Sequence, residues 1–268
     1  MSMNILVCVK QVPDTTEIKI DPVTNTLIRA GVPSIVNPFD AYALEMAVRL
    51  KEKAGGKITV VSMGPAQAKE ALKSCLAVGA DQAFLVTDRA FGGSDTLATS
   101  YILSCAVKKM EEDQGAPFDF IFCGKQAIDG DTGQVGPSLA QHLGLARVTY
   151  AVDCEWNDEH LEVKREYDEG YDILKCPIPA LVTVSKPSYE PRYPTIRSKM
   201  AAGRAVIGEI TAADLEIDLS KAGLKGSPTK VKKTFTPVHN KQGVKIQEET
   251  GEQSALKLVQ LMTDANLV

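Results

Sequence analysis

Apolar runs alternate with helical patterns along the first 150 residues, and this alternation limits the fold more than any other feature of the chain. The runs lie at 5–9, 57–62, 82–86 and 118–123. Between them, apolar residues recur at helical spacing in three stretches, 41–48, 68–76 and 98–106. Apolar strands separated by helices form parallel sheets covered on both faces. Right-handed crossovers then predict an α/β fold, a Rossmann-like three-layer sandwich with a mainly parallel sheet.

The pattern changes after residue 147. Short strand-like runs at 148–155, 160–166 and 171–175 are joined by turns, and 180–184 is another apolar run. We expect them to make an antiparallel addition to the same sheet. The sequence therefore predicts one α/β domain over 1–184.

The remaining chain divides into a loop and an arm. A proline-rich stretch at 186–194 excludes regular helix and predicts a loop, with a short helix, over 185–203. Residues 219–247 hold seven lysines and no acidic residue, and 254–262 has one apolar helical face. We expect 204–268 to be an extended arm and helix that lie against another chain, because a long arm has no core of its own. A partly disordered tail is the alternative.

A glycine-rich turn at 124–136 is the strongest indication of a ligand. It follows the apolar run at 118–123 and precedes a helical pattern at 138–143. Open α/β sheets bind ligands where strands end and helices begin, and free N–H groups at a helix start attract anions. The turn predicts a nucleotide pocket, although its spacing is not that of a Walker A loop. A strand-to-helix loop without a ligand is the other interpretation.

Composition narrows the class of protein. The net charge of −4 gives no basic field for nucleic acid, and no apolar run is long enough for membrane insertion. The N-terminus lacks the pattern of a signal peptide. Six cysteines without CxxC spacing and three scattered histidines predict reduced thiols in a cytoplasmic protein and no metal site.

Several separated motifs resemble one family. They are Val-Cys-Val-Lys-Gln-Val-Pro-Asp at 7–14, Asn-Pro-Phe-Asp at 37–40, Val-Ser-Met-Gly-Pro-Ala-Gln at 61–67, Gly-Lys-Gln-Ala-Ile-Asp at 124–129 and Glu-Pro-Arg-Tyr at 190–193. Together they resemble the β subunit of electron-transfer flavoproteins over nearly the whole chain. One departure occurs in the family signature, where Glu169 replaces the first glycine and Asp172 holds the acidic position. We interpret this departure as a tolerated turn variant.

The resemblance implies an obligate heterodimer whose larger α subunit carries an electron-transferring FAD, while this chain holds a nucleotide. No residue is expected to be catalytic, since the cofactor carries the chemistry. The cofactor-binding residues implied by the motif matches and by the helix starts are Cys8, Lys10, Asn37, Pro38, Phe39, Asp40, Met63, Gly64, Ser94, Asp95, Thr96, Thr99, Gly124, Ala127, Ile128, Asp129, Thr132, Gly133, Gln134 and Val135.

The nucleotide is AMP in conventional members and FAD in electron-bifurcating ones. Gly-Gly-Ser-Asp-Thr-Leu-Ala-Thr-Ser at 92–100 resembles the bifurcating members and favours FAD, although a capped helix start that touches no ligand is the alternative. The implied function is hydride acceptance from NADH, with electrons passed to ferredoxin or flavodoxin and, through the α-subunit FAD, to an acyl-CoA dehydrogenase. NADH oxidation is expected only within the heterodimer.

Residues 185–193 match the loop with which family members dock the dehydrogenase. This implies docking roles for Ser188, Tyr189, Glu190 and Arg192, with Ser188 at the position of the usual leucine anchor. Two other classes of protein stay open. The stretch at 92–96 resembles the core of an ATP-using PP-loop, which normally follows the first strand rather than the third. An interaction protein with an empty pocket is the second.

Overall fold

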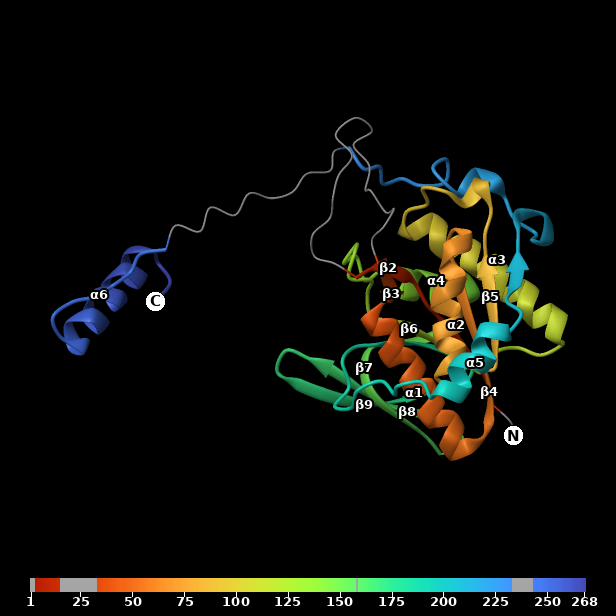
Figure 1. Ribbon diagram of the computed structural model, residues 1–268, viewed down its shortest axis with the longest axis horizontal. Coiled ribbons are helices and arrows are strands. Elements are labelled where there is room, and N and C mark those ends of the chain that lie inside the picture. The colour runs from red at the N-terminus through yellow and green to blue at the C-terminus, as the bar shows by residue number, and fades with distance from the viewer. Residues whose placement is uncertain (1–2, 15–32, 158, 233–242) are drawn as a thin grey trace. The chain divides into compact units, whose positions relative to one another are not determined.

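The computed structural model describes residues 3–14, 33–157, 159–232 and 243–268. The helices are α1 Pro38–Ala54, α2 Lys69–Ala77, α3 Thr96–Gln114, α4 Val135–Leu143, α5 Ile196–Arg204 and α6 Gly251–Asp264, with short 3₁₀ turns η1 Ala66–Ala68, η2 Arg89–Phe91, η3 Ala212–Asp214 and η4 Leu219–Lys221. The strands are β1 Met3–Cys8, β2 Gln11–Pro13, β3 Ser34–Val36, β4 Gly56–Met63, β5 Gln82–Val86, β6 Phe120–Gly124, β7 Ala146–Trp156, β8 Leu161–Tyr167, β9 Gly170–Cys176, β10 Ala180–Val184 and β11 Gly208–Ile210 (Figure 1).

One sheet contains nine of the strands in the described residues, in the order β11-β5-β4-β1-β6-β10-β7-β8-β9. Strands from β11 to β7 pair in parallel, and β7, β8 and β9 pair antiparallel. The long β7 serves both parts, since its first half pairs with β10 and its second half with β8. The predicted mainly parallel sheet with an antiparallel addition is confirmed. The run at 180–184 was expected in that addition, and this was wrong: as β10 it lies between β6 and β7 and pairs in parallel with both.

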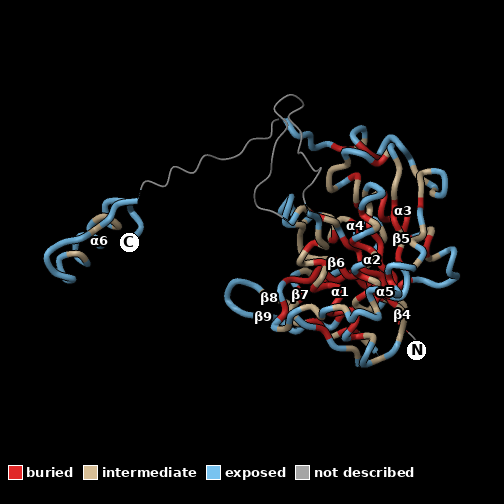
Figure 2. Tube along the Cα trace, viewed as in Figure 1, coloured by how far each residue is buried: buried red, intermediate tan, exposed pale blue. Residues whose placement is uncertain are grey.

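Helices cover the parallel part of the sheet on both faces. Apolar residues of α1 and α2 pack on one face, in a cluster with Ile5 and Val7, and those of α3 and α4 pack on the other, in a cluster with Leu6. The alternation of neighbouring β1 residues between the two clusters follows from the two-residue period of a strand. Figure 2 shows the buried segments concentrated along the sheet between these helices. The predicted three-layer sandwich is confirmed.

The helices begin and end where local chemistry requires it. Proline stands at the first position of α1, where its missing N–H costs nothing. The Asp95 carboxylate caps the start of α3 by accepting from the N–H groups of Leu97 and Ala98. Left-handed glycines, Gly115 and Gly144, end α3 and α4. The predicted helical patterns therefore appear as α1, α2, α3 and α4.

Three short strands, β2, β3 and β11, were not predicted from the sequence. Strands β2 and β3 form a separate antiparallel pair, and β11 adds a parallel strand outside β5. Three residues carry too little periodicity for either to be detected. The helix expected at 254–262 is present as α6. The chain forms two compact units, Met1–Lys232 and Lys233–Val268, and the domain limits at 184 and 203 stay predictions.

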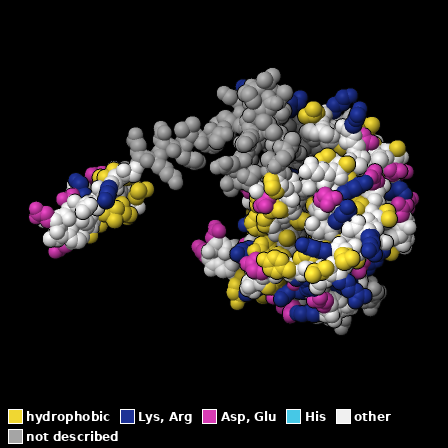
Figure 3. Space-filling model, in the orientation of Figure 1, with side chains coloured by type: hydrophobic (Ala, Val, Ile, Leu, Met, Phe, Trp, Pro, Cys, Tyr) yellow, Lys and Arg dark blue, Asp and Glu magenta, His cyan; other side chains and the backbone are white. Residues whose placement is uncertain are grey.

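Surface chemistry agrees with the modest net charge. Lys and Arg side chains are interleaved with Asp and Glu over the visible face of the first unit (Figure 3). On α6 the apolar side chains gather along one side of the helix (Figure 3). In the part of the chain that the structure describes, no helix combines the length and the apolar character needed to cross a bilayer.

Candidate functional site

The predicted cofactor residues converge because the parallel strands end at one edge of the sheet. Cys8 ends β1, Met63 ends β4 and Gly124 ends β6, three strands that are neighbours in the sheet. Helices α1 and α4 begin directly beyond this edge. This is the edge at which open α/β sheets bind ligands.

A buried carboxylate joins two of these strand ends. The Asp40 side chain accepts from the backbone N–H of Lys10 at 2.7 Å and from that of Gly124 at 3.0 Å. A Cβ at Gly124 would lie 2.4 Å from Asp40 Oδ1, so only glycine allows this approach. Burial raises the pKa of Asp40 to about 7, although both N–H groups and the nearby Lys10 ammonium oppose the rise.

The Asn37 side chain fixes the loop that follows β6. Its amide donates to the carbonyl of Gln126 at 2.8 Å, and its oxygen accepts from the N–H of Ile128 at 3.1 Å. Asn37 is fully buried, so these contacts satisfy a group that would otherwise be costly to bury. The sequence analysis assigned Asn37 to cofactor binding, whereas in this structure its amide group bonds the loop. Ligand contact by Asn37 stays a prediction.

Lys10, which follows β1, forms an ion pair with Asp129 in the loop that follows β6. The Lys10 ammonium lies 2.6 Å from Asp129 Oδ1, and 49 % of the Lys10 side chain is exposed. Because the pair is solvated, it contributes at most about 1 kcal/mol to stability. Lys10 is thus free to exchange Asp129 for another anion at small cost.

The start of α4 is open to an anion. Its N-cap residue, Gln134, makes no side-chain capping bond, and Gly133 before it has a φ of 63°. Instead, Gln134 Oε1 accepts from the Thr96 hydroxyl at 2.8 Å, which joins the starts of α3 and α4. The α4 amides therefore have no side-chain competitor within the described residues, and Thr132 and Val135 flank them.

The start of α3 is occupied by the chain itself. Asp95 Oδ1 accepts from the N–H groups of Leu97 and Ala98, and Oδ2 accepts from the N–H and hydroxyl of Thr229. The Ser94 hydroxyl donates to the Phe91 carbonyl and accepts from the Gly223 N–H. The expected cap of α3 is present. Cofactor contact by Ser94 and Asp95 stays a prediction, as it does for Thr99.

Three of the four predicted docking residues contact α1. Ser188 and Glu190 are exposed. Arg192 bonds the carboxylates of Glu45 and Glu52, and the Glu190 carboxylate accepts from the Tyr42 hydroxyl at 2.9 Å. The Arg49 guanidinium carbon lies over the Tyr189 ring, 3.9 Å from the centroid of that ring. These three side chains therefore fix the loop, and contact with a partner stays a prediction.

Sequence reasoning missed the role of Glu45. It lies on the apolar face of α1 beside Leu44 and Val48, and only 5 % of it is exposed. An acidic residue on a face predicted to be buried needs a cation, and this signal was available in the sequence. The cation, Arg192, is remote in the chain. Thr229 gave no such signal, because an exposed threonine in an arm is ordinary.

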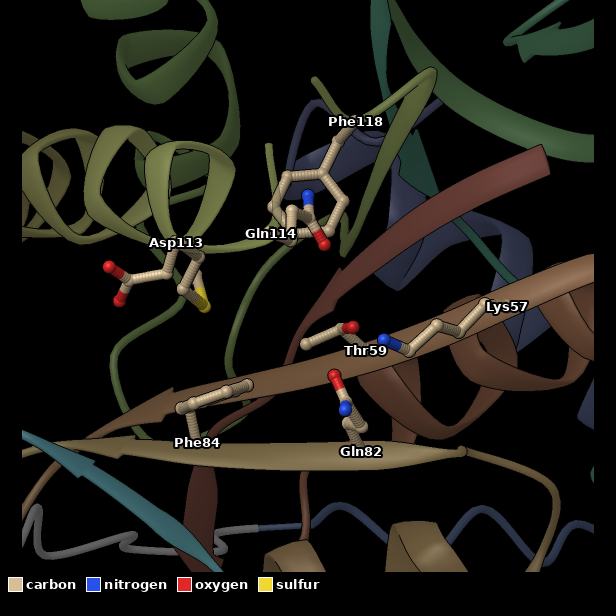
Figure 4. Close-up of a pocket in the computed structure, with 8 residues that line it drawn as sticks. Lys57, Thr59, Gln82, Phe84, Asp113, Gln114 and Phe118 are labelled. Carbon is tan, nitrogen blue, oxygen red and sulfur yellow. The ribbon is translucent and has the colours of Figure 1, made fainter. Parts of the chain in front are cut away.

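The structure also contains a cavity of about 420 Å³ that holds none of the predicted residues. It lies between the first halves of β4 and β5 and the end of α3 (Figure 4). Its lining includes the apolar side chains of Phe84 and Phe118 and the polar side chains of Lys57 and Gln82. The cavity is therefore toward the amino end of the sheet, away from the strand ends described above.

Comparison with known proteins gives a consistent family. Residues 24–215 match the model of the electron transfer flavoprotein domain. The chain is 52 % identical to the electron transfer flavoprotein subunit beta of Megasphaera elsdenii, over 95 % of both chains. It is 47 % identical to protein FixA of Azotobacter vinelandii, over 88 % of this chain and 84 % of that one. It is 43 % identical to the caffeyl-CoA reductase-Etf complex subunit CarD of Acetobacterium woodii, over 99 % of this chain and 100 % of that one.

Proposed function

Because the chain belongs to the electron transfer flavoprotein family as a β subunit, we propose that it binds FAD at the strand ends and takes part in NADH-driven electron bifurcation. Its partner is an α subunit with an FAD of its own. In the proposed reaction the two electrons of NADH separate. One reduces ferredoxin or flavodoxin, and the other reaches an acyl-CoA dehydrogenase through the α subunit.

The residues at the strand ends fit a nucleotide. The uncapped start of α4 offers backbone N–H groups to a phosphate, whereas Asp95 already occupies those of α3. A phosphate is therefore expected at Gly133 and Gln134. Lys10 adds a positive charge for the phosphate, because among the described residues its ammonium is bound only by the exposed ion pair with Asp129. A bound flavin would supply hydride acceptance and single-electron transfer, and the chain would bind it, orient it and set its electrostatics.

The hydrogen bond between Thr96 and Gln134 is the observation on which we propose FAD rather than AMP. It joins the starts of α3 and α4 at 2.8 Å, so a ligand at α4 has polar groups of α3 beside it. Thr99, one turn further along α3, is partly exposed and carries a second hydroxyl. A dinucleotide can use this second group, and a mononucleotide at α4 has no need of it.

A conventional β subunit that holds AMP is the second candidate. Ser94 and Asp95 favour it, because both side chains are satisfied within the chain. The stretch at 92–100 then serves the fold alone. In this case the chain carries no redox centre and binds its nucleotide for structure and docking.

Exposed apolar side chains mark the proposed docking surfaces. Tyr193, Ile196 and Met200 are 93 %, 82 % and 57 % exposed on the loop after Arg192 and on α5. We assign them to the acyl-CoA dehydrogenase, and the name of the CarD relative, which belongs to a complex with a CoA-ester reductase, supports such a partner. The apolar side of α6, with Leu256 and Val259, is assigned to the α subunit.

The test is the nucleotide content of the heterodimer co-purified from its host. The complex is denatured, and released FAD and AMP are quantified per heterodimer. Two FAD and no AMP support the proposal. One FAD and one AMP refute it and leave the conventional β subunit.

A further inference from the structure

Two glycine-containing turns, far apart in the sequence, pack against each other beside the candidate site. One precedes α3 and the other lies at 223–229, near the end of the first unit. Gly93 has a φ of 72°, and a Cβ there would lie 2.6 Å from the Leu224 side chain. Gly223 has a φ of 60°, and its Cβ would lie 2.2 Å from the Ala90 carbonyl. A residue other than glycine would be strained by the positive φ at both positions, and at Gly223 its Cβ would also meet the backbone of the opposite turn.

Hydrogen bonds hold the two turns together around Asp95. Its backbone N–H donates to the Ser227 hydroxyl at 2.8 Å, and Ser227 is only 3 % exposed. Its Oδ2 accepts from the Thr229 N–H at 2.9 Å and from the Thr229 hydroxyl at 2.8 Å. Although burial opposes the effect, the hydrogen bonds from Thr229 and the α3 amides lower the pKa of Asp95, so the carboxylate is charged at neutral pH.

The two carboxylate oxygens of Asp95 therefore have separate tasks. Oδ1 caps α3 at 3.0 Å from the N–H groups of Leu97 and Ala98. Oδ2 holds Thr229, from which the chain continues to Lys232 and then to the second unit. The residue after Asp95 is Thr96, whose hydroxyl bonds Gln134 at the start of α4. Asp95 thus bonds Thr229, after which the C-terminal segment (residues 230–268) begins, and is adjacent in sequence to Thr96, which bonds the start of α4.

We propose that Asp95 is a positioning residue that couples the nucleotide site to the C-terminal segment, so that bound nucleotide and a fixed exit at Thr229 stabilise each other. This inference rests on the proposed function, because it requires a nucleotide at the start of α4. A ligand that orders Thr96 and Gln134 also orders Asp95, and the order extends to Thr229. By linkage the effect is reciprocal, and such couplings are typically about 5- to 150-fold.

The test compares two aspartate-to-asparagine variants in the full heterodimer. Asp95→Asn keeps one oxygen for the helix cap but replaces the acceptor of Thr229 by an NH₂ group, which cannot accept. Asp88→Asn is the matched control. Asp88 also caps a turn with one oxygen, at Ala90, and accepts with the other from a residue remote in the chain, Ala212, but neither hydrogen bond involves a residue of the proposed nucleotide site.

The readout is amide hydrogen exchange at 223–229 with nucleotide bound, after its removal by dialysis, and after FAD or AMP is added back. Bound nucleotide is quantified in each sample. We expect nucleotide removal to accelerate exchange at Thr229 at least fivefold in the wild type and in Asp88→Asn, and less than twofold in Asp95→Asn. A loss of stability alone would change exchange in both nucleotide states and leave their ratio unaltered.

The outcomes separate the two proposals. Equal exchange with and without bound nucleotide in the wild type overturns the coupling alone, as does an Asp95→Asn variant that responds like Asp88→Asn. A wild-type heterodimer in which this chain holds no nucleotide overturns the proposed function, and the coupling with it. Thr229→Val, which lacks the hydroxyl and keeps the N–H, should give a response between those of the wild type and Asp95→Asn.

Discussion

Arg192→Met should destabilise the chain by about 3 kcal/mol, since the change removes a cation from a buried carboxylate. Arg192 Nε lies 2.8 Å from Glu45 Oε2, and a second guanidinium nitrogen lies 3.1 Å from Oε1. The Glu45 side chain is only 6 % exposed. Removal of one partner of a buried ion pair costs about 3–5 kcal/mol, because the other charge stays in a poorly solvated position.

Two further contacts place the expected cost at the lower end of that range. Arg49 lies 3.2 Å from Glu45 and is half exposed, so it compensates part of the lost charge. The bond from Arg192 to Glu52, whose side chain is 57 % exposed, adds at most about 1 kcal/mol. Arg192→Lys should recover only part of the loss, because an ammonium cannot bond both carboxylates in the forked geometry.

The assay is equilibrium urea unfolding of the full-length chain, followed by the fluorescence of Trp156. This single tryptophan packs edge-on against Phe120, with ring centroids 5.7 Å apart, and reports on the core. Arg192→Met combined with Glu45→Gln should regain most of the lost free energy of unfolding, because no buried charge remains. Lys53→Met, which breaks an exposed pair with Glu155, is the surface control and should cost less than about 0.5 kcal/mol.

A result within about 0.5 kcal/mol of the wild type for Arg192→Met would refute this reasoning. The same conclusion follows if the double variant is no more stable than the single one. Either result would mean that the Glu45 carboxylate does not depend on Arg192 for its stabilisation in the folded chain. The contact of Tyr189 with Arg49 would then contribute more to fixing the loop at 185–193 than the Arg192–Glu45 pair.

Three further predictions concern the strand ends. The pKa of Asp40 is raised from 3.8 to about 7, so the folded chain binds this proton more tightly than the unfolded chain. The contribution of Asp40 to the free energy of unfolding therefore falls as the pH rises from about 4 to about 7, and Asp40→Asn should flatten this decline in urea titrations at pH 5 and pH 8. Gly136→Ala should lower the unfolding midpoint by the equivalent of about 1–3 kcal/mol, because a Cβ there lies 2.6 Å from Thr183 Cγ2; an unchanged midpoint would show that α4 can shift outward. Thr96→Val should reduce FAD retained per heterodimer about fivefold or more, at a cost of about 1 kcal/mol per lost hydrogen bond, and full retention would place the cofactor away from α3.

The regular part of the fold was predictable because its signals are local and long. The apolar run at 82–86 coincides with β5, and the helical face around Ala98 and Ile102 lies in α3 as expected. Strand β11 was not predictable, since its three residues make sense only as partners of β5. Elements of this kind are selected by tertiary contacts rather than by their own periodicity.

The site was predictable in its location but less so in the roles of its side chains. The glycine-rich turn lies at the strand ends, as expected for a parallel sheet. Asp95 and Arg192 were assigned to ligand and partner from their motifs, yet both bond residues more than a hundred positions away, Thr229 and Glu45. A sequence motif therefore predicts where a side chain lies, but its hydrogen-bond partner depends on polar groups that the fold brings near it from elsewhere in the chain.

The position of β11 has a consequence for synthesis of the chain. The outer edge of β5 is covered by a strand that the ribosome makes only after α5, so a nascent chain presents an unpaired, largely apolar strand edge during most of its elongation. Uncovered edges of this kind pair readily with other chains. Messages truncated before codon 208 should therefore yield insoluble product, whereas chains released after Lys232 already contain every strand of the sheet.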